Sequence, residues 1–174
     1  MEDSVTLEGG ALVINGVGAS ALIEAGLGEP LGANSVRLEA LEGVYALLKG
    51  RILSSNAPEL IRRLSDSRPD FWALYAVFSD LANQGKRVSF DSEVDAILQR
   101  EGEKRSYLVL SVDTPMTLAD IIARASKFEE VGWTPVLAIV DEHGTPIYYS
   151  VSSRPPSIER SVRAKDVGEG RPSS

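Results

Sequence analysis

The sequence predicts an α/β (α+β) fold of two small domains, with strands and helices mixed in both. Strand-like and helix-like apolar patterns alternate along the 174 residues, and one polar, proline-ended break interrupts them at residues 65–69. This break predicts an N-terminal mixed α/β domain over residues 1–67 and a C-terminal mixed sheet flanked by helices over residues 68–152. Residues 153–174 are rich in Ser, Arg, Gly and Pro and are predicted to form a flexible tail.

The first domain is predicted to open with a β-hairpin. Two short apolar runs, Val5–Leu7 and Ala11–Ile14, flank a Glu-Gly-Gly turn of the kind that joins antiparallel strands. Ser20–Ala25 is then predicted to form a short helical turn that ends at Gly26. Glycine at both ends of residues 28–32 predicts a loop there.

Helical periodicity is clearest after that loop. Four apolar residues recur at i, i+3, i+4 and i+7, so they are predicted to form one inward face of a helix. They are Leu41, Val44, Tyr45 and Leu48. Lys49 and Gly50 predict the C-terminal end of this helix. Two later helices are predicted to bury apolar residues at similar spacing: Leu60, Ile61 and Leu64 in one, and Phe71, Leu74, Tyr75, Phe78 and Leu81 in the other.

Strand-like runs dominate the second domain, namely Val88–Phe90, Tyr107–Val112, Pro135–Val140 and Ile147–Val151. The third of these is continuously apolar, as in a strand that is buried on both faces. Thr117, followed three residues later by Asp120, forms a capping box typical of a helix N-terminus. The inward residues predicted for that helix are Leu118, Ile121, Ile122, Ala125 and Phe128.

Composition limits the class of protein. Hydrophobic residues make up 43% of the chain and charged residues 25%, so most of it is expected to fold. No apolar run reaches the roughly 18 residues of a membrane helix. The first residues lack a secretory pattern, and the sequence contains no cysteine. We therefore expect a soluble cytoplasmic protein with no membrane partner.

The charge balance bears on the partners. A net charge of −7 argues against a free-standing nucleic-acid binder, which would present a basic surface. Residues 153–174 hold five basic and three acidic groups of the chain's 18 and 25, which leaves 13 against 22, or −9, for residues 1–152. An acidic body suggests a basic partner, although a solvated acidic surface is the commoner interpretation.

Motifs of the common nucleotide, metal and hydrolase sites are missing from the sequence. The chain has no P-loop, no HExxH and no GxSxG. His143 is its one histidine, and no second histidine or cysteine exists to complete a zinc-type site with it. We therefore predict no cofactor and no bound metal, and we favour a surface turn over a catalytic role for His143.

Tyr148 and Tyr149 are adjacent in the last predicted strand. Successive side chains in a strand point to opposite faces, so one of the two is expected to face the sheet's core and the other to point away. The outward tyrosine is a candidate interface residue, because tyrosine is enriched where apolar and polar surfaces meet a partner. Core packing is an alternative of equal weight.

Four segments resemble, in order and in register, those of the archaeal tRNA-splicing endonucleases. They are VRLEALEGVYALLKGRI, FWALYAVFSDLANQGKRVSF, SYLVLSV and PVLAIVDEHGTPIYY. The resemblance runs from about Leu7 to Val151. It implies a two-domain fold whose C-terminal domain is restriction-endonuclease-like and acts as a metal-independent ribonuclease on the bulge-helix-bulge of precursor RNA.

The resemblance also implies three catalytic groups: a Tyr as general base on the 2′-hydroxyl, a His as general acid on the leaving 5′-oxygen, and a Lys that stabilises the charged transition state. All three are absent. The tyrosine position falls in Ile97–Gln99, the histidine position is Lys104, and the lysine position falls in Gly132–Pro135. The resemblance therefore implies a structural, non-catalytic subunit. Such a subunit assembles with a catalytic paralogue, two of each, and acts on precursor tRNA through that complex.

Two segments match the family's assembly surfaces. An acidic turn matches the loop that docks into a basic pocket of a neighbouring subunit, and it consists of Asp141, Glu142, His143 and Gly144. The last strand matches the one that pairs catalytic and structural subunits, and its residues are Ile147, Tyr148, Tyr149 and Val151.

Two other functions stay open. One alternative to the structural subunit is an active metal-independent ribonuclease that uses divergent basic residues. The other is a stand-alone interaction protein on the same fold. Four basic residues are candidates for RNA contact and would be the catalytic groups of such a nuclease. They are Lys104, Arg105, Arg124 and Lys127. Lysine and arginine hold their protons at neutral pH and so make poor general acids, which favours the structural subunit.

Overall fold

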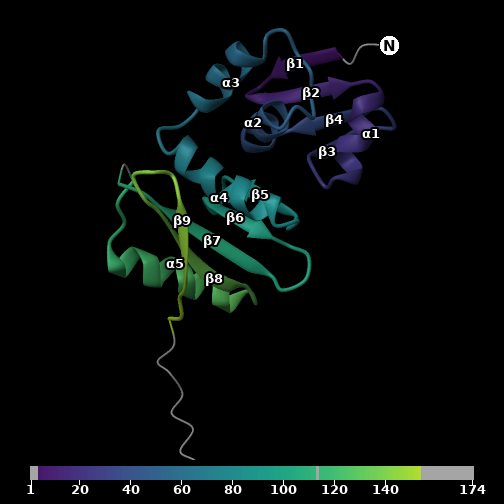
Figure 1. Cartoon of the computed structure of the whole chain (residues 1–174). Coiled ribbons are helices and arrows are strands. Elements are labelled where there is room, and N and C mark those ends of the chain that lie inside the picture. The colour runs from purple at the N-terminus through teal and green to yellow at the C-terminus, as the bar shows by residue number, and fades with distance from the viewer. Residues whose placement is uncertain (1–3, 113, 154–174) are drawn as a thin grey trace, which may run out of the picture.

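Two β-sheets, one from each half of the chain, are connected by three helices (Figure 1). The computed structural model describes residues 4–112 and 114–153. Helices and strands are mixed in both halves, which confirms the predicted α+β fold. The predicted tail lies outside the described residues, except for Ser153. Within the described ranges, no helix combines the length and apolar character needed to cross a bilayer.

The first sheet has the strand order β1-β2-β4-β3, and all its neighbouring strands are antiparallel. Its elements are β1 (Ser4–Glu8), β2 (Ala11–Asn15), α1 (Val17–Glu24), β3 (Glu29–Gly32) and β4 (Ser35–Leu38). The predicted hairpin is confirmed, because Glu8 pairs with Ala11 across a two-residue turn. Gly9 and Gly10 have the positive φ angles, 56° and 82°, that such a turn requires.

The loop predicted over residues 28–32 is wrong in part, because residues 29–32 form β3. Every residue of β3 is exposed, so the strand carries no apolar alternation by which the sequence would reveal it. Backbone pairing with β4, for example Glu29 with Arg37, holds it in the sheet. Gly28 leads into the strand at a φ of +75°, where an added Cβ would lie 2.5 Å from the side chain of Leu38.

The connecting helices are α2 (Ala40–Leu48), α3 (Ala57–Ser65) and α4 (Phe71–Asn83). Three of the four inward residues predicted for α2 are buried: Leu41, Val44 and Tyr45. The prediction for Leu48 is wrong, since its side chain is 51% exposed whereas that of Leu47 is 7% exposed. Helix α2 packs on β2, α3 and α4 at once. Contacts on several sides therefore decide which residues of its last turn are buried.

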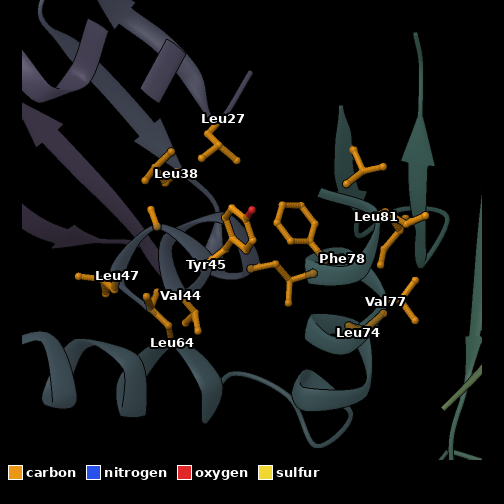
Figure 2. Close-up of a cluster of buried hydrophobic side chains, with 14 of the residues drawn as sticks. Leu27, Leu38, Val44, Tyr45, Leu47, Leu64, Leu74, Val77, Phe78 and Leu81 are labelled. Atoms are coloured by element: carbon orange, nitrogen blue, oxygen red, sulfur yellow. The ribbon is translucent and has the colours of Figure 1, made fainter. Parts of the chain in front are cut away.

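One continuous cluster of buried apolar side chains runs from the first sheet through α2 and α4 to the second sheet. Figure 2 shows its middle, where Tyr45 of α2 faces Phe78 of α4. The two rings meet edge to face, with centroids 5.7 Å apart. The residues predicted to face inward on α3 and α4 are all buried or half-buried. The division into two domains at residues 65–69 stays a prediction.

The second sheet has the order β5-β6-β7-β8-β9, in which β7 and β8 are parallel and the other pairs are antiparallel. Its strands are β5 (Val88–Asp91), β6 (Ala96–Gln99), β7 (Arg105–Leu110), β8 (Thr134–Val140) and β9 (Pro146–Ser150). The sequence does not predict β6, because it follows a stretch of acidic residues without clear alternation.

Helices α4 and α5 (Leu118–Glu130) cover opposite faces of this sheet (Figure 1). Tyr107 of β7 lies in the cluster beneath α4, whereas its neighbour Leu108 packs with Phe128 of α5. The predicted cap of α5 is confirmed, since the Thr117 hydroxyl accepts a hydrogen bond from the Asp120 amide at 3.1 Å.

Two of the five inward residues predicted for α5 are wrong. Leu118 is 71% exposed and Ile122 is 43% exposed. The other three are buried: Ile121, Ala125 and Phe128. Helix α5 packs on the sheet through a narrower stripe than its apolar sequence predicts, and it leaves apolar side chains on its outer side.

Candidate functional site

One end of the second sheet brings together the three positions at which the resemblance places catalytic groups. Gln99 ends β6, Lys104 precedes β7, and Thr134 begins β8. In the strand register, Gln99 lies opposite Arg105, and Arg105 lies opposite Thr134. The Thr134 amide donates to the carbonyl of Lys104 at 2.9 Å. Residues far apart in the sequence thus form one compact site.

The side chains at this sheet end include a neutral amide and a buried tyrosine. Gln99 carries a neutral amide, and its Oε1 accepts a hydrogen bond from the hydroxyl of Tyr107 at 3.0 Å. Tyr107 is the one tyrosine bonded there among the described residues, and burial raises the pKa of its hydroxyl. Tyr107 is 2% exposed, so its hydroxyl is not open to a substrate.

The carboxylates at this end are held by arginines. Glu103 pairs with Arg105 at 2.5 Å, and Glu101 pairs with Arg87 at 3.1 Å. The Arg100 guanidinium lies over the indole ring of Trp133, 5.6 Å from its centroid. The sheet end therefore combines internal ion pairs with exposed cations.

The four candidates for RNA contact fall into two separate places. Lys104 and Arg105 lie at the β6–β7 turn, whereas Arg124 and Lys127 lie on α5. Arg124 is bound to the β5–β6 turn, at the other end of β6: its Nη2 donates to the carbonyls of Val94 and Asp95 at 2.9 and 2.5 Å. Both α5 cations line a surface cavity of about 480 Å³ beside that turn. They do not extend the surface around Lys104.

In the acidic turn, one side chain bonds to the turn's own backbone and two others are exposed to solvent. Oδ1 of Asp141 accepts hydrogen bonds from the amides of His143 and Thr145, at 2.9 and 2.8 Å. Gly144 closes the turn at a φ of +76°. The side chains of Glu142 and His143 are 82% and 79% exposed. Asp141 therefore braces the turn, and Glu142 and His143 are presented to solvent.

Strand β9 lies at the edge of the sheet, where it pairs with β8 alone among the described strands. Tyr148 points inward, and its hydroxyl donates to the Asp80 carboxylate of α4 at 2.6 Å. Burial and the Asp80 hydrogen bond raise the pKa of Tyr148 well above its usual range. Tyr149 and Ile147 point the other way and are 51% and 48% exposed. The prediction that one tyrosine faces the core and the other points away is confirmed. Val151, beyond β9, is half-buried, and its amide bonds to the carbonyl of Pro135 at 3.3 Å.

A basic pocket of about 230 Å³ lies between the two halves of the chain, and sequence reasoning does not find it. Tyr45 and Phe78 form its aromatic wall, and Arg51 and Lys86 line it. Lys49 and Arg51 both lie within 6 Å of the Tyr45 ring centroid, at 5.7 and 5.8 Å. In the part of the chain that the structure describes, Lys49, Arg51 and Lys86 have no ion-pair partner. Lys86 is 35 residues from Arg51 in the sequence, so the sequence does not show that these cations lie near one another.

Comparison with known proteins identifies a relative of this chain. No family model matches the chain. The chain is 30% identical over 141 residues to the tRNA-splicing endonuclease of Pyrococcus furiosus, and the match covers 74% of this chain and 82% of that protein. Identity at this level over most of both sequences indicates common descent. The chain belongs to the tRNA-splicing endonuclease family.

Proposed function

We propose that the chain is a structural, non-catalytic subunit of a tRNA-splicing endonuclease. In this role it assembles with a catalytic paralogue, two of each, to cut introns at bulge-helix-bulge motifs of precursor tRNA. The observation that carries the proposal is the sheet end, where the positions that the resemblance assigns to Tyr, His and Lys lie close together. They fall in Ile97–Gln99, at Lys104 and in Gly132–Pro135, and none of the three groups is present there. Attack of the 2′-oxygen on phosphorus, with departure of the 5′-oxygen, needs an acceptor for the 2′-hydroxyl proton and a donor to the leaving oxygen, and Gln99, Lys104 and Thr134 supply neither near neutral pH.

The side chains that a divergent nuclease would have to use are poorly placed for catalysis. Lys104 is a cation that keeps its proton at neutral pH, so it stabilises charge but does not serve as a general acid. Tyr107 is buried and bonded to Gln99. Arg124 is bound to backbone carbonyls at the other end of β6. The sheet end thus offers cations, carboxylates that are held in ion pairs and a buried tyrosine for a reaction that needs three cooperating groups.

Two exposed features support assembly with a partner. The edge of β9 presents Ile147 and Tyr149 on one face, and an unpaired strand edge is a template for pairing with another chain. The acidic turn presents Glu142 at the adjacent end of β9. An acidic turn fits a basic pocket of a neighbouring subunit by charge complementarity. This chain's own basic pocket at Arg51 and Lys86 has the complementary charge, so docking in both directions fits the proposal.

Reconstitution tests the proposal directly. The purified chain should not cleave a bulge-helix-bulge RNA, whereas addition of a paralogue that carries Tyr, His and Lys at the three positions should produce cleavage in EDTA. The paralogue alone, at the same total concentration, is the matched control. Metal-independent cutting by this chain alone would refute the structural-subunit proposal in favour of the divergent nuclease. Failure to bind the paralogue would favour a stand-alone interaction protein.

A further inference from the structure

The β6–β7 turn leaves two cations weakly paired or unpaired next to an aromatic ring. The two carboxylates of this turn, Glu101 and Glu103, are already held in ion pairs by Arg87 and Arg105 respectively. Lys104 is exposed and has no ion-pair partner among the described residues. These pairings concentrate positive charge at this point of a chain whose net charge is −7.

Arg100 is the second of these cations. Its side chain is 61% exposed, and its ion-pair contact with the Asp91 carboxylate is long, at 3.8 Å. Since Gln99 at the end of β6 pairs with Arg105 at the start of β7, Arg100 and Lys104 are the first residues beyond this pair, in the turn that connects the two strands. They are therefore neighbours at the sheet end.

Trp133 completes the surface. It precedes Thr134, which lies opposite Arg105 on β7, so Trp133 is beside Lys104. Its half-buried ring packs against the small cluster beneath α5, and the Arg100 guanidinium covers it at 5.6 Å. A guanidinium over an indole presents a flat, charged face, and unpaired RNA bases stack on aromatic rings and on guanidinium planes.

We propose that Arg100, Lys104 and Trp133, which together form the sheet-end patch, bind unpaired nucleotides of RNA. Lys104 and Arg100 contact phosphates, and one base stacks on the Arg100–Trp133 pair. This inference rests on the proposed function, because it gives the non-catalytic sheet end a role in holding the RNA that a catalytic partner cuts. An acidic protein surface would use the same cations but would not need the flat stack.

Binding of a short fluorescein-labelled single-stranded RNA to the full chain, followed by anisotropy over a range of salt concentrations, tests the phosphate contacts. Arg100→Gln with Lys104→Gln should weaken binding about tenfold at low salt. It should also reduce the slope of log K against log salt by about 1.4, because each contact to a single strand contributes about 0.7. The control is Arg62→Gln with Arg63→Gln, which removes two exposed cations from α3 and should leave both quantities unchanged.

The stack is tested through Trp133. Trp133→Leu should weaken RNA binding roughly fivefold or more without a change in the salt slope, and Trp133→Phe should keep most of the affinity. Thermal unfolding of both variants shows whether the fold survives; Trp133→Phe keeps the test valid if Trp133→Leu does not fold. A polyglutamate probe identifies the other class of ligand.

The proposed role of the patch would be overturned if the wild-type chain showed no measurable RNA binding, or if the two double-glutamine variants lost RNA affinity equally. It would also be overturned if polyglutamate binding depended on Arg100 and Lys104 while RNA binding was insensitive to Trp133→Leu. Assembly with the catalytic paralogue is measured separately by light scattering. If assembly and cleavage proceed but the patch variants change nothing, this inference alone fails. If the chain does not assemble while the RNA results hold, the proposed function fails and the patch remains.

Discussion

Neighbouring residues of identical chemistry have different roles in this protein. Leu47 is 7% exposed and Leu48 is 51% exposed, although both belong to the last turn of α2. Tyr148 donates to Asp80, whereas the next residue, Tyr149, is half exposed at the sheet edge. Within each pair, the surroundings of the side chain separate the two roles.

The leucine pair provides a matched test of the helix face. Leu47→Ala should lower the free energy of unfolding by about 2–5 kcal/mol, because it removes buried apolar surface and leaves a cavity. Leu48→Ala should change it by less than about 0.5 kcal/mol, as exposed positions do. Urea unfolding followed by circular dichroism measures both. Equal effects of the two substitutions would show that the face of α2 is assigned wrongly.

The tyrosine pair separates stability from association. Tyr148→Phe should cost about 1–3 kcal/mol of unfolding free energy, because the Asp80 carboxylate loses a donor in a half-buried place. Tyr149→Ala should leave stability within about 0.5 kcal/mol but weaken binding to the catalytic paralogue. Unfolding curves and light scattering provide the two measurements. If Tyr149→Ala assembles as well as the wild type, β9 is not the interface.

At the level of elements, one carboxylate of the acidic turn stabilises the turn's own backbone. Asp141 accepts two backbone amides of the turn, so replacing it would disturb the loop as well as its charge. Glu142 has an exposed side chain whose one ion-pair contact within residues 4–112 and 114–153 is to His143, at 3.6 Å. The turn's docking role is therefore tested at Glu142, while Asp141→Asn preserves the accepting oxygen.

Glu142→Lys should leave folding unchanged and weaken assembly with the catalytic paralogue. Reversal of a charge that docks into a basic pocket typically costs 2–5 kcal/mol, or roughly thirty-fold to several thousand-fold in the association constant. Size-exclusion chromatography with light scattering measures assembly, and circular dichroism confirms the fold. Glu8→Lys, an exposed reversal on β1, is the control. Wild-type assembly by Glu142→Lys at physiological salt would mean that the turn does not dock.

At the level of the whole molecule, one core and one overall charge are shared by both halves. The buried cluster crosses from the first sheet to the second through Tyr45 and Phe78. The chain is acidic overall, yet weakly paired and unpaired cations gather in the basic pocket and at the sheet end. Surfaces suited to anionic ligands therefore exist on a protein whose composition argues against them.

The shared core predicts cooperative unfolding. Thermal unfolding should show one transition, because the halves lose common apolar contacts when either one opens. Both tryptophans, Trp72 on α4 and Trp133 before β8, follow the break at residues 65–69, so their fluorescence reports on the predicted C-terminal domain, while far-ultraviolet circular dichroism reports on the whole chain. The two unfolding curves should coincide. Phe78→Ala should lower the free energy of unfolding by about 3–5 kcal/mol, and both curves should move together. Separate transitions would show that the halves fold independently.

The sequence by itself determined the features that depend on near neighbours along the chain. The first hairpin, the faces of α2 and α4 up to their last turns, and the cap at Thr117 all follow from turn chemistry and periodicity. The absence of Tyr, His and Lys from the three catalytic positions is likewise visible in the sequence, since a missing side chain needs no structure to be noticed.

Tertiary structure alone decided which elements and charges have partners. Strand β3 is fully exposed and is held by backbone pairing, so its residues give no apolar pattern. Strand β6 has only three apolar residues, and its pairing with β5 and β7 makes it a strand. The exposure of Leu48 and Ile122 depends on what packs beside α2 and α5. The convergence of Arg100, Lys104 and Trp133 depends on strand register. Burial and charge pairing are set by residues distant in sequence, which local periodicity does not encode.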